Sequence, residues 1–247
     1  QGSWRLEGGL GRLIHTLANG VDPARLHNSA VVERLIYAQD KITAHLVDGR
    51  QITANRVVLA LPPRLARAIE MTPVLPPHAV QALEGISTWM AGQAKAVAVY
   101  DTAFWREAGL SGDGMSRFGP MVEIHDASPS RGGPFALFGF IGVPPQGRTN
   151  EAALRAAVVQ QLERLFGPKA AMPKHLFLKD WAADPFTATL ADHAPMYSHP
   201  RYGMPTAVRD LWDGRLILGG SEMAEQFGGY VEGALEAAEI VLNSMRG

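Results

Sequence analysis

The sequence lacks cysteine altogether, in a chain of 247 residues. Disulfide bonds, thiolate metal ligands and a cysteine nucleophile are therefore excluded. Basic residues form no run and the formal net charge is -1, which argues against a nucleic-acid-binding surface. No apolar stretch approaches the roughly 18 residues of a membrane span, and the first residues show no signal-peptide pattern. We expect a cytoplasmic protein that binds neither nucleic acid nor membranes.

A complete nucleotide-binding motif is also lacking. Gly9 and Gly11 begin a string close to Gly-x-Gly-x-x-Gly, but no strand precedes them and Ile14 stands where the last small residue belongs. The Lys-Ser/Thr pair of a P-loop is absent as well. We therefore predict only a helix here, with apolar residues at Leu10, Leu13, Ile14 and Leu17.

The clearest pattern that is present lies near the end of the chain. Residues 216–218 form an apolar run typical of a buried strand, and the turn Gly219-Gly220-Ser221-Glu222 follows. A helix is predicted to begin near Gly229, with one apolar face made of Val231, Ala234, Leu235, Ala238, Val241, Leu242 and Met245. A strand, a glycine turn and a helix N-terminus together favour an electron-rich ligand group, either a phosphate or a carbonyl that gains negative charge.

This segment carries a family resemblance. Leu-Gly-Gly-Ser-Glu (218–222) and Gly-Gly-Tyr-Val-Glu-Gly-Ala-Leu-Glu-Ala-Ala (228–238) resemble the C-terminal flavin-binding signature of the FAD-dependent amine oxidases, which include monoamine, polyamine and L-amino-acid oxidases. A strand and a helix with packing glycines would explain Gly233 and the apolar face, but not the whole ordered string. The resemblance implies FAD, held noncovalently because no cysteine can form the link. It assigns cofactor contacts to Gly220, Ser221, Glu222, Gly229, Tyr230 and Val231, and a substrate-facing role to Tyr230.

A second stretch resembles another part of the same cofactor site. Strands are predicted over residues 31–37, 41–47 and 51–54, with Asp48-Gly49 as the turn between the last two. Residues 56–63 then resemble the "VVxAxP" strand that follows a three-stranded β-meander in the family. This implies flavin contacts from Ala60 and Pro62, and an adenine contact from Val32, or from Val31 if the alignment shifts by one. Ordinary core packing is the alternative for either valine.

A lysine in the middle of the chain is the next candidate. Residues 93–101 alternate as a strand, and Lys95 shares a face with Val97 and Val99. A buried ammonium needs a polar partner or a function, whereas a lysine on an edge strand could reach solvent. Gly92-x-x-Lys95 followed by Phe104-Trp105 resembles the family segment whose lysine holds a water against flavin N5. The resemblance therefore implies a catalytic role for Lys95.

A tryptophan-led loop completes the candidate site. Residues 181–189 resemble the family loop near the flavin, which places Trp181 among both catalytic and cofactor-binding residues. Leu190 and Ala191 stand where some monoamine oxidases carry the attachment cysteine and a tyrosine, so only Tyr230 matches the two-ring aromatic cage. This leaves larger amines or amino acids as substrates. No metal is expected, because Asp192, His193 and His199 fit no ligand pattern and are interpreted as solvated loop residues.

The expected fold is α+β or α/β, as part of a two-domain FAD-binding oxidoreductase in which cofactor-domain segments flank a mixed-sheet substrate domain. Residues 1–75 and 201–247 would belong to the FAD-binding domain and residues 76–200 to the substrate-binding domain. The family's N-terminal Gly-x-Gly-x-x-Gly unit does not occur in the sequence. We therefore expect the C-terminal portion of such an enzyme, with an N-terminal dinucleotide-binding segment or subunit as a partner, or association with a second copy.

The activity implied by the resemblance is oxidation of an amine C–N bond. A hydride would leave the carbon beside the amine for flavin N5, and O2 would reoxidise the flavin to give an imine product and hydrogen peroxide. Two alternatives stay open. The chain could be a noncatalytic fragment or subunit that needs an N-terminal partner, or it could belong to a related flavin desaturase acting on carbon–carbon bonds.

Overall fold

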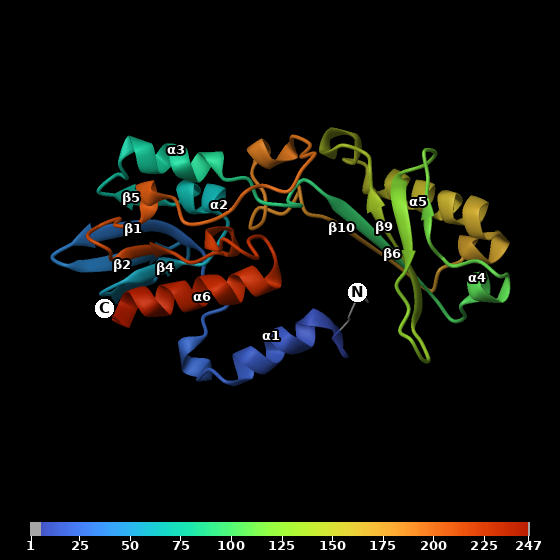
Figure 1. Ribbon diagram of the computed structural model, residues 1–247, viewed down its shortest axis with the longest axis horizontal. Coiled ribbons are helices and arrows are strands. Elements are labelled where there is room, and N and C mark those ends of the chain that lie inside the picture. Colours follow the sequence, from blue (N-terminus) through green and yellow to red (C-terminus); the bar gives the residue numbers. More distant parts are fainter. Residues whose placement is uncertain (1–5, 247) are drawn as a thin grey trace. The chain divides into compact units, whose positions relative to one another are not determined.

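The computed structural model describes residues 6–246, and its chain forms two compact units whose elements are labelled in Figure 1. The first unit combines the described part of Gln1–Asn55 with Ile69–Pro73, and the second contains the rest. Residues 1–5 and 247, at the ends of two expected domains, lie outside the described residues. The boundaries at residues 75 and 200 stay a prediction.

A four-stranded sheet forms the first unit, with strand order β3-β2-β1-β5. The predicted antiparallel meander is present as β1 (Val32–Ala38), β2 (Lys41–Leu46) and β3 (Gln51–Ala54). Strand β5 (Glu70–Thr72) pairs in parallel with β1, so this sheet is mixed. Its buried apolar side chains are Leu35, Ile42, Leu46 and Met71.

Helix α1 (Gly9–Asn19), in the same unit, begins where the sequence predicts but buries none of its side chains. Leu10, Ile14 and Leu17 are each more than half exposed. The helix prediction is confirmed, while its apolar face contributes nothing to the core formed by the described residues.

A five-stranded sheet dominates the second unit, in the order β10-β6-β9-β8-β7. Every neighbouring pair in this sheet is antiparallel. Its strands are β6 (Ala94–Tyr100), β7 (Gly114–Met115), β8 (Met121–Asp126), β9 (Phe135–Ile141) and β10 (His175–Asp180). Helix α4 (Phe104–Glu107) follows β6, and α5 (Glu151–Phe166) lies along one face of the sheet (Figure 1).

The core lies between this sheet and α5. Asn150 caps α5 by accepting a hydrogen bond from the N–H of Ala153. The buried face of β6 carries Ala94, Ala96, Ala98 and Tyr100, which pack in one cluster with Leu154, Val158 and Leu162 of the helix. Gln161 is also buried there, and its amide accepts from the N–H of Met121 at 2.8 Å and donates to the carbonyl of Met121 at 2.7 Å.

The second unit also contains a parallel pair of short strands, β4 (Val57–Leu59) and β11 (Leu216–Leu218). Its other helices are α2 (Pro63–Ala68), α3 (Pro77–Gly85) and α6 (Val231–Arg246). Short 3-10 turns across the described chain lie at Pro23–Arg25, Pro145–Gly147, Pro168–Ala171, Leu190–His193, Thr206–Val208 and Ser221–Met223.

Helix α6 corrects one expectation. It begins at Val231, and its buried face consists of Gly233, Ala237 and Val241, of which only Val241 belongs to the predicted apolar stripe. Leu235 and Leu242 are about half exposed, at 48% and 51%. The reason is close approach: the small residues let α6 pack against the turn after β11, and this turns the larger apolar side chains away from the core.

Candidate functional site

The predicted cofactor residues meet where β4 and β11 end. The two strands pair in register from Val57 with Leu216 to Leu59 with Leu218, so the turns that follow them leave the same edge of the sheet. A side-chain carbon at Gly220 would lie only 2.8 Å from the carbonyl oxygen of Leu61, so the close approach of the two turns requires glycine. The structure thus brings the segment from Ala60 to Pro62 against the glycine turn.

Glu222, in this turn, has a buried carboxyl group. Its side-chain partner is the hydroxyl of Ser221, which donates to it at 3.3 Å. Burial raises the pKa of the Glu222 carboxyl above its usual range, and the charge of Asp192 acts in the same direction, while bonds from its own backbone and Ser221 oppose them. A buried carboxyl with one long side-chain bond has acceptor capacity left for the donors of a ligand.

Tyr230 belongs to a cluster of four rings, which we call the aromatic cluster: Trp89, His199, Tyr202 and Tyr230. The rings of Tyr230 and His199 stack almost in parallel, with centroids 5.3 Å apart and an interplanar angle of 4°. His199 also contacts Trp89 at 5.0 Å and Tyr202 at 5.3 Å. Tyr230 stays 56% exposed, so most of its surface is available to a ligand. Of this cluster, the sequence indicated only Tyr230 as a site residue, and His199 was interpreted as a solvated loop residue.

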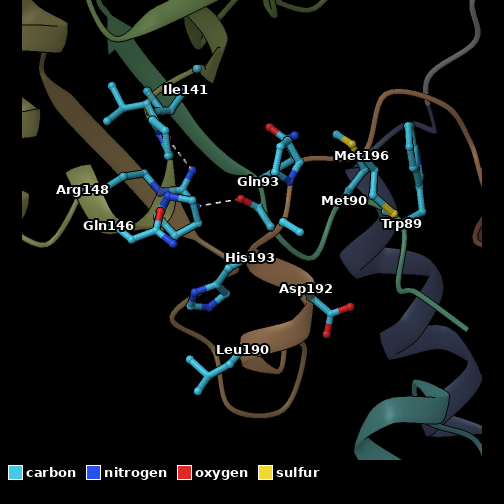
Figure 2. A pocket seen from close by; sticks show the side chains of 17 residues that line it. Trp89, Met90, Gln93, Ile141, Gln146, Arg148, Leu190, Asp192, His193 and Met196 are labelled. Carbon is cyan, nitrogen blue, oxygen red and sulfur yellow. Dashed lines mark hydrogen bonds between the residues drawn. The ribbon is translucent and has the colours of Figure 1, made fainter. Parts of the chain in front are cut away.

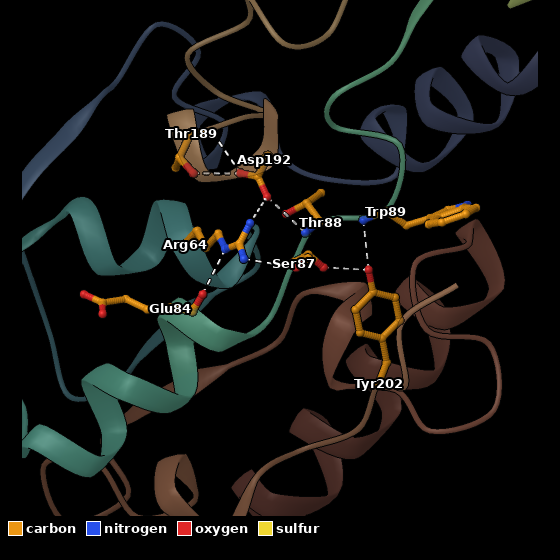
Figure 3. A network of polar contacts seen from close by, with 8 residues as sticks. All are labelled: Arg64, Glu84, Ser87, Thr88, Trp89, Thr189, Asp192 and Tyr202. Atoms are coloured by element: carbon orange, nitrogen blue, oxygen red, sulfur yellow. Dashed lines mark hydrogen bonds and ion pairs between the residues drawn. The ribbon is translucent and has the colours of Figure 1, made fainter. Parts of the chain in front are cut away.

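The glycines beside Tyr230 explain why the cluster forms. Gly229 has a left-handed backbone, with φ of 80°, and a side-chain carbon there would lie 2.8 Å from the Tyr202 ring. The Tyr202 hydroxyl donates to the carbonyl of Ser87 at 2.7 Å and accepts a hydrogen bond from the backbone N–H of Trp89 at 2.8 Å (Figure 3). Burial raises the pKa of Tyr202 to about 12, so the hydroxyl stays neutral and keeps both bonds near neutral pH.

An ion pair between Arg64 and Asp192 holds the neighbouring segments together (Figure 3). Asp192 has 2% of its side chain exposed and Arg64 15%, so the interpretation of Asp192 as a solvated loop residue is wrong. The other carboxylate oxygen accepts the N–H and the hydroxyl of Thr189, and Arg64 donates to the hydroxyl of Ser87. Sequence reasoning missed the pair because its members stand 128 positions apart.

A carboxylate of α6 fixes the loop between the glycine turn and the helix. Glu236 accepts the backbone N–H groups of Glu225, Gln226 and Phe227, at 3.0, 3.2 and 3.1 Å. These bonds outweigh the opposing effect of desolvation and hold the pKa of Glu236 below its usual range. The site therefore contains two glutamates, Glu222 and Glu236, whose surroundings shift their pKa values in opposite directions.

Lys95 and Trp181 lie together at one end of the five-stranded sheet. The Lys95 ammonium is 5.1 Å from the centroid of the Phe140 ring, a cation–π contact, and its neighbour on β10 is Lys179. Lys179 lies 4.7 Å over the ring of Trp181, and the backbone N–H of Trp181 donates to the carbonyl of Gln93 at 3.0 Å. Strand β6 is internal in the sheet, so the edge-strand alternative for Lys95 is wrong.

The segment before Lys95 connects these two groups of residues. It carries Trp89 of the aromatic cluster and Gln93, whose carbonyl accepts a hydrogen bond from the backbone of Trp181.

The two valines assigned to the cofactor site lie in different units. Val231 is exposed at the first position of α6. Val32 is half-buried on β1 of the other unit, and its adenine contact stays a prediction.

A cavity of about 490 Å³ lies beside Trp89 (Figure 2). Its walls come from the segment before β6, the end of β9 with the turn that follows it, and the 3-10 turn Leu190–His193 with the loop after it. They include Trp89, Met90, Gly92, Gln93, Ile141, Gly142, Val143, Pro144, Pro145, Gln146, Arg148, Leu190, Asp192, His193, Ala194, Pro195 and Met196.

Residues 6–246 offer neither a metal-binding group of side chains nor a helix that could cross a membrane. No group of three His, Asp or Glu side chains in this range is placed to hold a metal ion. None of the helices within it has the length and apolar character needed to cross a membrane.

Comparison with known proteins identifies the family. The model of the flavin containing amine oxidoreductases matches residues 1–241. Probable flavin-containing monoamine oxidase A of Dictyostelium discoideum is 26% identical, over 94% of this chain and 51% of its own length. L-amino acid dehydrogenase of Synechocystis sp. is 25% identical, over 98% of this chain and 51% of its own.

Solved structures show the same fold. A mutant putrescine oxidase has a TM-score of 0.76 at 24% identity, and cyclohexylamine oxidase from Brevibacterium oxydans has 0.73 at 24%. Each comparison covers 97% of this chain and 53% of the other. The chain spans about half the length of the curated relatives it matches. It belongs to the family of flavin-containing amine oxidoreductases, whose cofactor is FAD.

Proposed function

We propose that this chain forms the substrate side and part of the cofactor site of an enzyme that oxidises the C–N bond of an amine with FAD. The observation that carries the proposal is the meeting of the two turns at Leu61 and Gly220, beside the buried carboxyl of Glu222 and the exposed ring of Tyr230. Family membership supports the flavin, and the geometry supports the assignment of residues.

The residues at this edge fit a flavin. Gly220 and Gly229 leave backbone exposed where side chains would collide, and Glu222 has unused acceptor capacity. We assign flavin contacts to these residues together with Ala60, Pro62, Ser221, Tyr230, Val231 and Trp181, and the adenine contact to Val32. Binding would be noncovalent, because the chain has no cysteine.

When bound, the flavin would supply the redox chemistry, taking a hydride from the carbon beside the amine and passing electrons to O2 to give hydrogen peroxide and an imine product. The protein's part is to bind and orient. The exposed face of Tyr230 would pack against the substrate and direct the nonbonding electrons of the neutral amine. Lys95 carries three N–H donors and would hold a water molecule near the reacting atoms.

Cofactor binding can be tested with the chain and FAD. Gly220→Ala places a methyl group against the carbonyl of Leu61, so it should reduce FAD binding at least about tenfold in a titration followed by the visible spectrum. Gly85→Ala is the matched control, because a side-chain carbon at Gly85 meets no atom within 4 Å. Unchanged FAD binding by a folded Gly220→Ala variant would remove the assignment of this turn.

The role of Lys95 has a separate test. In the flavin-loaded enzyme, Lys95→Met should slow reoxidation by O2 more than reduction by the amine. The control is Lys179→Met on the neighbouring strand, which should slow each of the two steps less than Lys95→Met does. Stopped-flow absorbance at the flavin band separates the two half-reactions. Equal slowing of both by Lys95→Met would contradict the assignment.

A second candidate is a binding unit that becomes active only with a dinucleotide-binding segment. The half-length match to the curated relatives favours it. In that case the chain alone would stay colourless with FAD, and coexpression with a β-α-β dinucleotide-binding segment would restore colour and amine-dependent peroxide. Peroxide release with amines also distinguishes an amine oxidase from a desaturase. The domain boundaries, a cytoplasmic location and self-association stay predictions.

A further inference from the structure

One nitrogen of His199, in the aromatic cluster, is a hydrogen-bond acceptor without a partner among residues 6–246. The imidazole Nδ1 lies 2.8 Å from the carbonyl oxygen of Pro200, so Nδ1 carries the hydrogen of the neutral ring and donates it. Nε2 is then left with a free lone pair. His199 is exposed, so a ligand can approach the ring from solvent.

The neighbours of His199 fix the position of this nitrogen. The ring is stacked on Tyr230 with 4° between the ring planes, and it also contacts Trp89 and Tyr202. A side-chain carbon at Gly229 would lie 3.5 Å from Nε2. Gly229 and Tyr230 are residues to which we assign contacts with the flavin. The free acceptor therefore lies at the turn where we place the reaction.

The other polar groups around the cluster are engaged or withdrawn from solvent. The Tyr202 hydroxyl already makes two hydrogen bonds (Figure 3). The charges of Glu222, Asp192 and Arg64 all act on Tyr202, so these three groups share its surroundings. Asp192 and Arg64 are paired with each other, and Glu222 is 5% exposed and assigned to the cofactor. None of these three charges faces the exposed side of the cluster.

We infer that His199 binds the nitrogen of the substrate: Nε2 accepts a hydrogen bond from an amine N–H, beside the rings of Tyr230 and Trp89. The inference rests on the proposed amine oxidation and adds a residue that touches the substrate. The carbon that loses the hydride is bonded to this nitrogen, so holding the nitrogen beside Gly229 also holds that carbon near the flavin. The ammonium in solution and the neutral amine that reacts both carry N–H bonds. A protonated imidazole has no acceptor and repels a cation.

Two cations of similar size and equal charge test this: tert-butylammonium, which has N–H bonds, and tetramethylammonium, which has none. tert-Butylamine has no hydrogen on the carbon beside its nitrogen, so it binds without turnover. Affinity for the full chain is measured by NMR at about pH 8, where imidazoles are mostly neutral, from shifts of the Trp89 indole N–H signal. tert-Butylammonium should bind at least about fivefold more tightly. An aromatic site without an acceptor favours tetramethylammonium instead, through cation–π contact.

Variants of His199 separate the acceptor from the ring. His199→Phe keeps an aromatic ring beside Tyr230 but removes the acceptor, so it should abolish the preference for tert-butylammonium. His199→Gln supplies an amide oxygen that does not titrate, so it should keep the preference. In the original chain the preference should disappear between about pH 8 and 5, as the imidazole gains a second proton, while His199→Gln keeps it. His78→Phe, exposed on α3, is the control and should behave as the original chain.

The outcomes separate this inference from the proposed function. Equal binding of the two cations, tighter binding of tetramethylammonium, or binding of neither overturns the inference. A folded His199→Phe variant that keeps the preference, or a preference in the original chain that does not change with pH, overturns it as well. The proposed function fails on a different readout, the absence of a flavin spectrum and of amine-dependent peroxide in the chain supplied with FAD and a dinucleotide-binding partner. The ratio of the two cation affinities does not depend on that readout.

Discussion

The five-stranded sheet and the β4–β11 edge are stabilised in different ways. The sheet and α5 bury a continuous set of apolar side chains, including Trp105, Leu137 and Leu162. At the β4–β11 edge, the groups withdrawn from water include Asp192 and Glu222, while larger apolar side chains of α6 stay exposed. Burial of apolar surface therefore stabilises both regions, since Leu59, Leu216 and Leu218 are buried as well, but buried carboxylates and close backbone contacts are added in the second region, where we place the cofactor.

The largest expected effect comes from the buried ion pair. Asp192→Asn leaves the guanidinium of Arg64 without its counter-charge, so unfolding free energy should fall by about 3–5 kcal/mol. The control is Glu84→Gln, which breaks the exposed pair with Arg67 and should cost less than about 1 kcal/mol. Urea denaturation measures both. If the two changes cost the same, the polar pair is not what maintains this region.

Core packing gives the next largest contrast. Leu162→Ala opens a cavity between α5 and the sheet and should destabilise the protein by about 2–5 kcal/mol. Leu235→Ala, the same change on the half-exposed face of α6, should cost about 0.5 kcal/mol or less. The measurement is the urea midpoint of the purified chain. A large loss at Leu235 would show that this face is covered in solution.

The pH dependence of stability distinguishes the two glutamates of the site, Glu222 and Glu236. Because the pKa of Glu222 is raised, its contribution to stability is present below about pH 4.5 and is lost as pH rises through the raised pKa. Glu222→Gln should therefore be at least as stable as the original protein at neutral pH, with an advantage that shrinks on acidification. Urea midpoints between pH about 4 and 8 follow the trend. A variant that is less stable at neutral pH would indicate a charged partner for Glu222.

Glu236 should show the opposite and smaller trend. Its pKa is lowered by the three backbone donors, so its contribution is present above about pH 4.5 and is lost as pH falls through the lowered pKa. Glu236→Gln should destabilise the protein at neutral pH, and the difference should vanish in acid. Glu239→Gln, exposed on the same helix, is the control. A difference that is constant with pH would exclude the carboxylate charge as its cause.

How far the sequence predicted the structure depends on how local the cause is. The meander and β6 were predicted within about a residue, because strand alternation and the turn at Gly49 act over a few positions. The burial of Asp192 was not predictable, since it depends on an arginine far away in the chain. The buried face of α6 was misassigned because close packing against a turn selected its small residues, which periodicity alone ranks below leucine.

The amide of Gln161 gives α5 a single position on the sheet. A glutamine side chain carries the same donor and acceptor as a peptide group, and here it serves as the missing strand neighbour of Met121. Sliding the helix by one residue would leave three buried polar groups unbonded, although the apolar contacts could re-form elsewhere. Glutamate lacks the donor, and the side chain of asparagine is too short. Glutamine at this position therefore fixes the register of α5 on the sheet, whereas the apolar contacts supply most of the packing energy.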